Sequence, residues 1–533
     1  PQSSSTSTAA AAEVANDHDN INENIQRRER KRSKKEAARQ RRLARIAKNG
    51  GPPETTFLGK HKWLGGAVDP DTGYIYGIPS HAHQIICIKP PQPSSAMANT
   101  DGTDATTVDT TTTDDTTTTT TTTTTAEITT IPLPNEIQQG HFKWLRGLVH
   151  DGHLYGIPAW NTAGVLKVEL STQKVNILPL PRSKDNYESD PIPWKEKVEE
   201  VDRGRWMWHG GAVGKAPSKE NGEEGAAAIY CPPSNAEYVL KVCLDGSDRV
   251  EEIGPPLSDG QNKWYGGILG VDGCVYAPPY TATGVLRIDP KNNDKVEVLG
   301  NFPRGKYLWH GGLLAKSTGV IYAFPAHSNE VLCIDTNVRQ RGSLGKSVNH
   351  DDDVGGVEDD ESWRVSTIPI HRHVDDIDSP DLQYKWLGGS YGADGCIYGM
   401  PSDATTILRI DPITNTATTF GRVSNTNNKW QGGVLSQIDK CIYAVPADDS
   451  TVLRIDTDPD TPSFTPTLAI DYVGSGFQDI DDKWQGGFVG RDERIYAIPE
   501  NCNHVMVIDP GVGVAGGEKK KSSAVMLTGL EDS

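Results

Sequence analysis

Six lysines stand directly before a tryptophan in this chain, a placement that gathers positive charge if the tryptophans occupy equivalent positions in the fold. They are Lys62, Lys143, Lys263, Lys385, Lys429 and Lys483. Ammonium groups attract phosphate and carboxylate as point charges. A ring of such lysines would therefore suit an anionic ligand or a phosphorylated peptide. The alternative is that each lysine pairs with a carboxylate of a neighbouring loop or faces water.

Two further tryptophans lack this lysine, and a histidine follows each of them instead. Met207 and Leu308 precede Trp208-His209 and Trp309-His310. Other polar residues follow a proline that recurs after each tryptophan. These are His81, His83, Asn161, Asn235, His327, Asn329, Asp403, Asp448, Asp449, Glu500, Asn501 and His504. If all these side chains converge on one mouth, they form a candidate ligand-binding site.

Histidines and carboxylates can also hold zinc or calcium, which need three or more ligands within about 2.0–2.6 Å. The candidate residues share no metal-ligand spacing, and the chain contains no G-x-S-x-G, P-loop or H-E-x-x-H motif. We therefore expect no cofactor and no metal, and we assign no catalytic residue from the sequence.

The elements that position these residues are repeated eight times. Each copy has a tryptophan, a glycine three residues later, then a tyrosine with a proline three residues after it. The tryptophans are Trp63, Trp144, Trp208, Trp264, Trp309, Trp386, Trp430 and Trp484. The tyrosines are Tyr76, Tyr155, Tyr230, Tyr276, Tyr322, Tyr398, Tyr443 and Tyr496. A glycine pair usually follows the tryptophan, but the second copy has Arg146 before Gly147.

The copy from Lys385 to Gly421 predicts four short strands. Asp394-Gly395 favours a tight turn between the first two, because both residues tolerate positive φ. Pro401 ends the second strand, since proline cannot donate to a ladder. The third, Ile407 to Ile410, ends at Asp411-Pro412, and Thr416 to Phe420 forms the fourth. Four strands in about 45 residues are the size of one propeller blade.

The sequence thus predicts an all-β fold, a β-propeller of eight four-stranded blades, with seven blades as the alternative. The layout resembles kelch and YVTN-type β-propeller repeats. The match lies in a strand that contains Ile397-Tyr398 and is followed by a strand that ends at Pro412. The resemblance implies the fold and no functional residue. Kelch repeats carry the glycine doublet after the tyrosine strand, whereas here it follows the tryptophan.

We interpret the tryptophans as packing wedges between neighbouring blades and the tyrosines as core residues with hydrogen-bonded hydroxyls. The alternative for the tryptophans is a ring of aromatic side chains that stack on a ligand. Ring closure needs a last strand, for which Thr55 to Gly59 and Ala524 to Leu530 are the two candidates.

Residues 55–533 are expected to form this single domain, and residues 1–54 a disordered basic arm. Low-complexity insertions are expected at about 91–126 and 339–365, because they hold too little apolar surface to order themselves. The segment from Arg27 to Lys48 has twelve basic and two acidic residues, a net charge of +10. It resembles a nuclear localisation signal or a nucleic-acid-binding arm.

The total net charge is −18, so the residues outside that segment sum to −28. Such a body repels nucleic acid, and we expect nucleic-acid contact only through residues 27–48. The eight cysteines form no C-x-x-C pair, and we expect them to be buried and reduced. Together with the lack of an apolar run that could span a bilayer, this favours an intracellular monomer, nuclear or cytoplasmic, without membrane contact.

The functional hypothesis is a non-enzymatic propeller that recognises a protein or peptide at its channel mouth. The alternatives are a metal-dependent hydrolase, as in propeller lactonases, and a binder of small anionic ligands at the same mouth. The candidate mouth residues are the six lysines with His209, His310, His81, His327, Asp403, Asp448 and His504.

Overall fold

The computed structural model divides the chain into two units, Pro1–Thr55 and Thr56–Ser533, and all the residues it describes belong to the second. The described residues are 59–92, 126–138, 141–160, 164–181, 206–217, 225–258, 260–338, 364–374, 376–460, 470–473, 480–511 and 522–527. The predicted arm over residues 1–54 lies outside them, as do most of the two predicted insertions. In these ranges no helix has the length and apolar character needed to cross a membrane.

Strands make up almost all the regular structure of the described residues, and they form consecutive groups of four. The first strands of the groups are β1 (Trp63–Val68), β5 (Trp144–His150), β9 (Ala212–Lys215), β13 (Ile268–Leu269), β17 (Trp309–Ala315), β21 (Trp386–Tyr391), β25 (Trp430–Leu435) and β29 (Trp484–Val489). The second strands are β2 (Ile75–Pro79), β6 (His153–Pro158), β10 (Ala227–Cys231), β14 (Val275–Ala277), β18 (Val320–Pro325), β22 (Ile397–Pro401), β26 (Cys441–Pro446) and β30 (Ile495–Pro499).

The third and fourth strands complete each group. The third strands are β3 (Gln84–Lys89), β7 (Val165–Glu169), β11 (Val239–Cys243), β15 (Val285–Asp289), β19 (Glu330–Asp335), β23 (Ile407–Asp411), β27 (Val452–Asp456) and β31 (Val505–Asp509). The fourth are β4 (Glu127–Pro132), β8 (Lys174–Leu178), β12 (Val250–Ile253), β16 (Lys295–Leu299), β20 (Val365–His371), β24 (Thr416–Phe420), β28 (Ile470–Val473) and β32 (Ser523–Leu527). A short 3₁₀ helix, η2 (Asn135–Ile137), follows β4.

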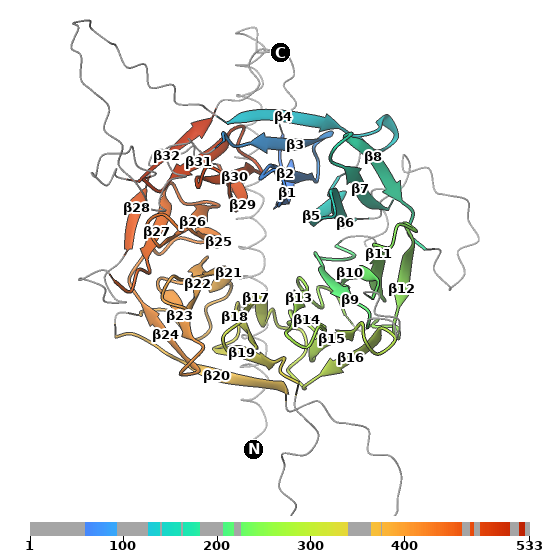
Figure 1. Ribbon diagram of the computed structural model, residues 1–533. Coiled ribbons are helices and arrows are strands. Elements are labelled where there is room, and N and C mark those ends of the chain that lie inside the picture. The colour runs from blue at the N-terminus through green and yellow to red at the C-terminus, as the bar shows by residue number, and fades with distance from the viewer. Residues whose placement is uncertain are drawn as a thin grey trace, which may run out of the picture. The chain divides into compact units, whose positions relative to one another are not determined.

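Each group is an antiparallel sheet whose strands lie in chain order, so every blade is a meander. The blades stand around a common axis, with the first strands innermost and the fourth strands at the circumference (Figure 1). We number the groups as blades 1 to 8 in chain order. Two of them are joined, because β20 of blade 5 pairs in parallel with β24 of blade 6. The predicted fold class, an all-β propeller of four-stranded antiparallel sheets, is confirmed.

The glycine pair after each tryptophan is needed where the first strand bulges. In blade 6 the register jumps from Trp386 opposite Pro401 to Gly389 opposite Gly399. Gly388 has φ 76°, which L side chains rarely adopt. A Cβ on Gly389 would lie 2.2 Å from the Tyr398 carbonyl oxygen. The doublet therefore permits close approach of the first two strands near the crowded axis.

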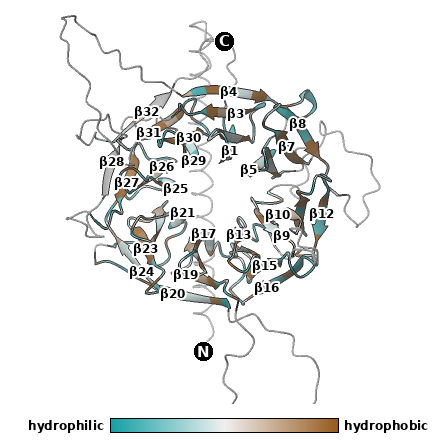
Figure 2. Cartoon of the chain, in the orientation of Figure 1, coloured by the Kyte–Doolittle hydropathy of each residue, from teal (hydrophilic) through white to brown (hydrophobic). Residues whose placement is uncertain are grey.

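Eight hydrophobic clusters fill the junctions between successive blades, and each contains the tryptophan of the later blade. Trp144, for example, packs among Tyr76 and Ile85 of blade 1 and Leu166 of its own blade. The cluster around Trp63 joins blade 8 to blade 1 and closes the ring. Hydrophobic residues accordingly concentrate along the strands (Figure 2). Each indole thus wedges two neighbouring sheets apart, as in the packing interpretation of the repeat.

Every one of these indole N–H groups donates to a backbone carbonyl at the start of the third strand of its own blade or one residue before it. Trp386 Nε1 bonds the Thr406 oxygen at 2.8 Å, and Trp484 Nε1 bonds that of His504 at 2.7 Å. The repeat tyrosines are also buried, and six of their hydroxyls, from Tyr230 onward, donate to a carboxylate in the same blade or to a side chain of the next one. Tyr398 donates to Asp394 at 2.9 Å, and Tyr230 donates to Asp294 at 2.6 Å.

The last blade is completed by the C-terminal candidate of the two that the sequence offered. β32 pairs with β31 from Val505 opposite Leu527 to Asp509 opposite Ser523. All eight cysteines are buried free thiols, as expected from their positions.

Candidate functional site

The tryptophan end of each first strand and the proline end of each second strand lie side by side, which defines the mouth of the ring. Trp63 stands opposite Pro79, and the same pairing recurs in the other blades. The mouth residues are those just before each tryptophan and just after each proline. The predicted convergence of these two loops on one face is therefore present.

A closed circuit of backbone hydrogen bonds runs around the mouth. In every blade, the N–H of the residue before the tryptophan donates to the carbonyl after the proline of the preceding blade. The N–H after the proline donates to the carbonyl of the residue before the tryptophan in its own blade. Lys429 N bonds the Ser402 oxygen at 3.1 Å, and Lys62 N bonds that of Glu500 at 3.2 Å across the junction of blades 8 and 1. The amides of all eight blades are thus linked into one ring.

The six lysines lie inside this circuit and are no more than 2% exposed. Four ammonium groups donate to a post-proline carbonyl of the preceding blade. These bonds are Lys143 to Ala82 (3.0 Å), Lys263 to Ala236 (2.9 Å), Lys385 to His327 (3.1 Å) and Lys429 to Ser402 (2.9 Å). Lys62 and Lys483 donate to the carbonyls of Gly59 and Ile480, three residues earlier. The ammonium groups therefore face backbone oxygens inside the walls rather than an open mouth.

Burial also changes the proton affinity of these lysines. Desolvation lowers the pKa of Lys143 to about 7, and of Lys385 and Lys429 to about 8. Met207 and Leu308, the residues in the same place in blades 3 and 5, show that the position accepts an apolar side chain. Lys143, Lys263, Lys385 and Lys429 thus link their blade to the preceding one, whereas the bonds of Lys62 and Lys483 to Gly59 and Ile480 hold the segment before their own blade. No ligand role for these lysines enters the function proposed below.

Four carboxylate or amide side chains of the post-proline loops also link neighbouring blades by a hydrogen bond. Each accepts the backbone N–H two residues before the next tryptophan. The bonds run from Asn262 to Asn235 (2.6 Å), Asn428 to Asp403 (2.7 Å), Asp482 to Asp448 (2.6 Å) and His61 to Asn501 (2.7 Å). The donor residues have φ of 50–55°, or 49° in His61, so their N–H groups turn toward the preceding blade. Asp403 and Asp448 are thus placed at the mouth and engaged in holding it together.

The remaining polar candidates have varied surroundings. Asp449 caps its own loop by accepting from Thr451 Oγ1 at 2.7 Å, and His83 is exposed. Among the described residues, no ring contact joins His504 to the other histidines of the mouth. Its carbonyl receives the Trp484 indole N–H. Asn161 lies outside the described residues.

Over the first blades, aromatic side chains occupy the mouth in place of these polar side chains that bond neighbouring blades. His61, His81, Phe142, Trp160 and Trp206 form a continuous chain of ring contacts. Phe142 is its centre, with ring centroids 4.3 Å from His81, 4.3 Å from Trp160 and 5.0 Å from Trp206. All five are partly exposed, and Leu64 and Leu145 pack beneath the three apolar rings. This group is called the first aromatic arc.

A second aromatic arc continues over blades 4 to 6 and consists of Tyr265, Tyr280, Tyr307, His327 and Tyr384. Tyr280 stacks on Tyr307 at 4.4 Å and contacts Tyr265 at 4.3 Å. His327 meets Tyr384 edge to face at 4.7 Å. His209 and His310 join it at the axis, where each contacts Tyr265, at 3.8 and 5.0 Å. Desolvation is the main cause that lowers the pKa of His81 and His310 to about 3, so both are neutral at pH 7.

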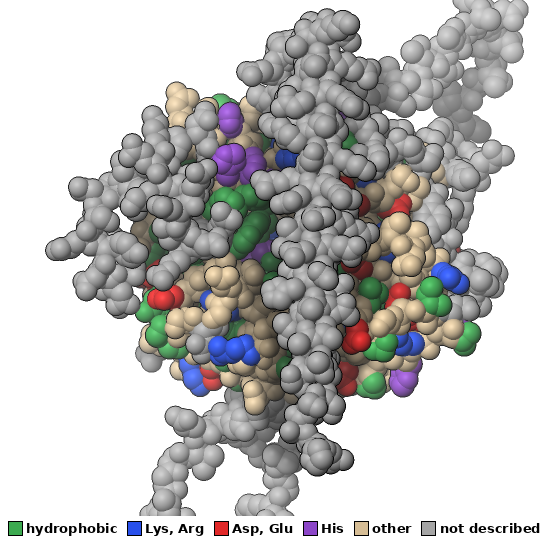
Figure 3. Space-filling model, turned by 180° about the vertical axis from the view of Figure 1, so that it is seen from behind, with side chains coloured by type: hydrophobic (Ala, Val, Ile, Leu, Met, Phe, Trp, Pro, Cys, Tyr) green, Lys and Arg blue, Asp and Glu red, His purple; other side chains and the backbone are tan. Residues whose placement is uncertain are grey.

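The mouth is therefore asymmetric, which the near-regular repeat did not indicate. Blades 1 to 6 present aromatic rings, whereas blades 6 to 8 present carboxylates, namely Asp378, Asp403, Asp448, Asp449, Asp481 and Asp482. Figure 3 shows one face of the protein, on which histidine side chains gather at the upper left next to hydrophobic ones, and several acidic side chains lie right of the centre.

Sequence reasoning missed the aromatic arcs because it compared the residues directly before the tryptophans. The informative position lies one residue earlier. It reads His61, Phe142, Trp206, Asn262, Tyr307, Tyr384, Asn428 and Asp482 in chain order. The change from aromatic to polar residues along this column was visible in the sequence.

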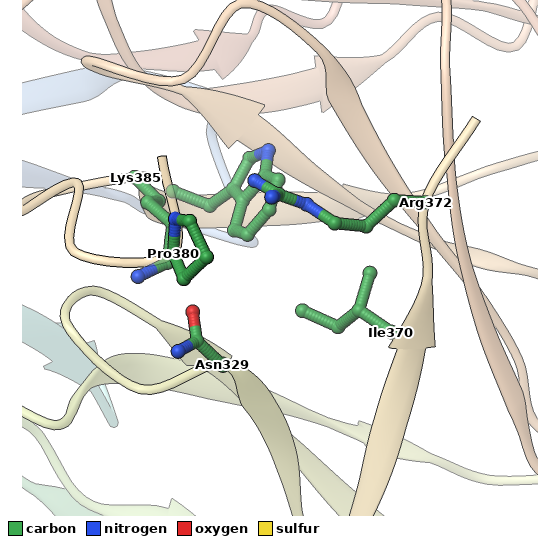
Figure 4. A pocket seen from close by; sticks show the side chains of 6 residues that line it. Asn329, Ile370, Arg372, Pro380 and Lys385 are labelled. Carbon is green, nitrogen blue, oxygen red and sulfur yellow. The ribbon is translucent and has the colours of Figure 1, made fainter. Parts of the chain in front are cut away.

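A separate cavity of about 230 Å³ lies between blades 5 and 6 (Figure 4). Its lining includes Arg372 and Lys385, two cations beside Asn329, Ile370 and Pro380. Arg372 pairs with Asp376 at 3.2 Å and donates to the Asp378 carbonyl at 2.7 Å. Lys385 donates to the carbonyls of His327 and Leu382. Both cations are thus satisfied by the segment that joins the two blades, and we assign this cavity to the joint.

Within the described ranges, no group of three or more histidine, cysteine, aspartate or glutamate side chains is arranged to hold a metal ion. The nearest approach to a catalytic pair is His61 Nδ1, 2.6 Å from Glu500 Oε1 across the closing junction. Burial of Glu500 raises the pKa of its carboxyl group.

Comparison with known proteins adds little beyond the fold. No family model and no curated protein matches the chain. Among solved structures, virginiamycin B lyase from Staphylococcus aureus is 13% identical with a TM-score of 0.40, over 67% of this chain and 92% of the lyase. AztD from Citrobacter koseri is 13% identical with a TM-score of 0.39, over 78% and 88%. The computationally designed Ika8 protein is 7% identical with a TM-score of 0.46, over 84% and 97%. Likeness at this level says nothing about activity.

If Lys429 links its blade to the preceding one, two substitutions of this residue should differ in how much stability they cost. Lys429→Met keeps the stem in place, as Met207 does in blade 3, and we expect the free energy of unfolding to change by no more than about 1.5 kcal/mol. Both variants lose the hydrogen bonds of Lys429 to the Ser402 and Thr426 carbonyls, but Lys429→Ala also leaves a cavity, and we expect it to lose about 2–4 kcal/mol. Urea unfolding of the two variants distinguishes a lysine that links two blades from a solvent-facing lysine, for which both changes would be nearly neutral.

The same variant carries a pH signature. Because the folded pKa of Lys429 is about 8, below its ordinary value of 10.5, the unfolded chain binds more protons between these pH values. Stability of the wild type should therefore rise as pH increases from about 8 toward 10. In Lys429→Met, the free energy of unfolding should rise less over the same pH range. An identical pH slope in both proteins would contradict the assignment.

Proposed function

We propose that this protein is a non-enzymatic β-propeller that binds a protein or peptide at its mouth. The observation that carries the proposal is the pair of aromatic arcs, which leaves partly exposed rings on six consecutive blades. Aromatic side chains supply large contact area at small entropic cost, and they dominate the energetics of many protein interfaces. The polar groups of the mouth, by contrast, are largely engaged in holding the blades together.

Charge favours a partner with apolar and basic residues side by side. The lysines of the mouth are buried, so the cations there offer little to an acidic peptide. The carboxylates of blades 6 to 8 adjoin the aromatic arcs, and Asp481 among them is exposed. A peptide that places an apolar or aromatic residue on Phe142 and Trp206 can direct a lysine or arginine toward these carboxylates. We propose that the protein acts as a monomer.

Hydrolysis at the same mouth is the second candidate, and the His61–Glu500 pair favours it. A histidine held by a buried carboxylate can act as a general base, since the carboxylate orients the ring and stabilises its charged form. Residues close to this pair on the first aromatic arc would then bind an apolar ester or lactone. The finer assignment to kelch or YVTN-type repeats also remains a proposal, supported by the Ile-Tyr and Ile-Asp-Pro strands.

Selection of random displayed peptides on the full chain tests the binding proposal. We expect peptides in which aromatic and basic residues are enriched. Replacing Phe142 or Trp206 by alanine should weaken a selected peptide about tenfold or more, as is usual for anchor residues. Ile413→Ser, a change of an exposed residue at the other end of blade 6, is the matched control and should change affinity less than about twofold.

Thermal unfolding of the same variants establishes that each one is folded before affinities are compared. Absence of enrichment, or equal affinity of the Phe142→Ala and Ile413→Ser proteins, would refute the binding proposal. Turnover of esters or lactones by the wild type, abolished in His61→Gln, would favour hydrolysis instead.

We also propose that residues 27–48 direct the protein to the nucleus and confine any nucleic-acid contact to that segment. Its twelve basic residues are clustered, while the rest of the chain is strongly acidic. Deleting residues 27–48 from a tagged copy should abolish nuclear accumulation, as seen by fluorescence microscopy. Replacing the deleted segment by a neutral linker of equal length controls for its length. An unchanged distribution would reject the proposal.

A further inference from the structure

Arg146 occupies a position that belongs to glycine in the other seven repeats. The first glycine of each pair has a positive φ, from 71° to 80°, and Arg146 keeps this conformation with φ 60°. A side chain with a Cβ is strained there by about 1–2 kcal/mol. Because only this copy of the repeat carries a strained side chain here, the Arg146 side chain is a candidate for a function.

The side chain of Arg146 extends into the space around the axis. At Gly311 and Gly432, its counterparts in blades 5 and 7, an added Cβ would meet open space. Arg146 itself reaches across two neighbouring blades. Its Cδ lies 3.3 Å from where a Cβ of Gly210 would be, and its Nη1 lies 3.9 Å from that of Gly266. The guanidinium is therefore held over the first strands of blades 3 and 4, and it is exposed to the axial space.

Within the described part of the chain, the surroundings of the guanidinium hold hydrogen-bonding groups and no counterion. Arg146 lies beside Gly210 and Gly266, which directly follow His209 and Tyr265, and its charge acts electrostatically on His209, Tyr265 and His310. Tyr265 contacts both histidine rings. Nδ1 of His209 is buried and unpartnered, and His209 is only 7% exposed. His310 Nδ1 is likewise buried without a partner. Among the residues that the structure describes, no hydrogen bond or ion pair engages Arg146.

We propose that the Arg146 guanidinium, with His209, Tyr265 and His310 around it, binds an oxyanion, either a carboxylate or a phosphate. A guanidinium presents parallel N–H donors that match both anions in bidentate geometry. An imidazole N–H and a phenol O–H can donate to the remaining oxygen atoms. The protein atoms around the guanidinium partly desolvate it and lower the pKa of Arg146, so a bound anion would stabilise its charged form. This proposal does not depend on the peptide-binding proposal, because it rests on Arg146, which lies on the axis and belongs to neither aromatic arc, although Tyr265 is shared with the second arc.

Arg146→Gly is the decisive variant because it restores the residue of the other seven repeats. We expect it to fold at least as stably as the wild type, since the strained φ is relieved. Calorimetric titration of the full chain with inorganic phosphate and, separately, with succinate should show saturable binding at one site. In Arg146→Gly the affinity for the bound anion should fall about tenfold or more. Arg249→Gln, which removes an exposed arginine at the other end of blade 3, should bind as the wild type does.

The choice between the two probes identifies the class of ligand. Binding of phosphate alone indicates a phosphorylated ligand, and binding of succinate alone indicates a carboxylate. No saturable heat with either anion would overturn the proposal. So would equal affinities of the wild type and Arg146→Gly, because the anion would then bind at a place that does not involve Arg146.

Discussion

The closed circuit of backbone hydrogen bonds around the mouth is the constraint on which the rest of the structure depends. Each blade contributes one peptide before its tryptophan and one after its proline, and each of these donates and accepts in turn. Because the bonds are in series, they polarise one another, and none can be removed without leaving a donor unpaired. The indole wedges set the angle between the sheets, and the circuit sets the register in which neighbouring blades meet.

This constraint decides which side chains remain available for binding. The residue before the tryptophan cannot face a ligand when its backbone belongs to the circuit and its side chain crosses to the preceding blade. For that reason the lysine column, the most conspicuous charge pattern in the sequence, is 2% exposed or less. The residue one place earlier lies at the mouth, and in seven of the eight blades its backbone is left-handed, with φ from 47° to 55°; Tyr307 is the exception. There the blades differ, and the difference between aromatic and acidic blades is where recognition can arise.

Much of the fold could be predicted from the sequence, because residues such as Trp386, Pro401 and Asp394-Gly395 determine strand ends and turns within their own repeat. The wedge packing of the tryptophans follows from one large ring in each repeat. The candidate site was predicted only in part. His209, His310, His81 and His327 lie at the mouth or axis, and the candidate residues Lys429 and Asp403 bond neighbouring blades. A sequence does not show across which junction a long side chain reaches, and that direction decides whether a charge is presented or buried.

The two proposed sites use different departures from the repeat. The aromatic arcs arise where aromatic residues replace the polar residues that bond neighbouring blades. The Arg146 site arises where an arginine replaces the first glycine of the pair. Both depend on the same rigid frame, because a partner can select one arrangement of rings only if the blades are fixed relative to one another.

Native-state hydrogen exchange at Lys62 tests this account most directly, because its amide donates to Glu500 and closes the ring between the last blade and the first. The account predicts that this amide exchanges as slowly as that of Lys429 within the circuit, through global unfolding alone. Exchange of Lys62 that is much faster than that of Lys429 and independent of denaturant would show an open ring, and it would contradict the account.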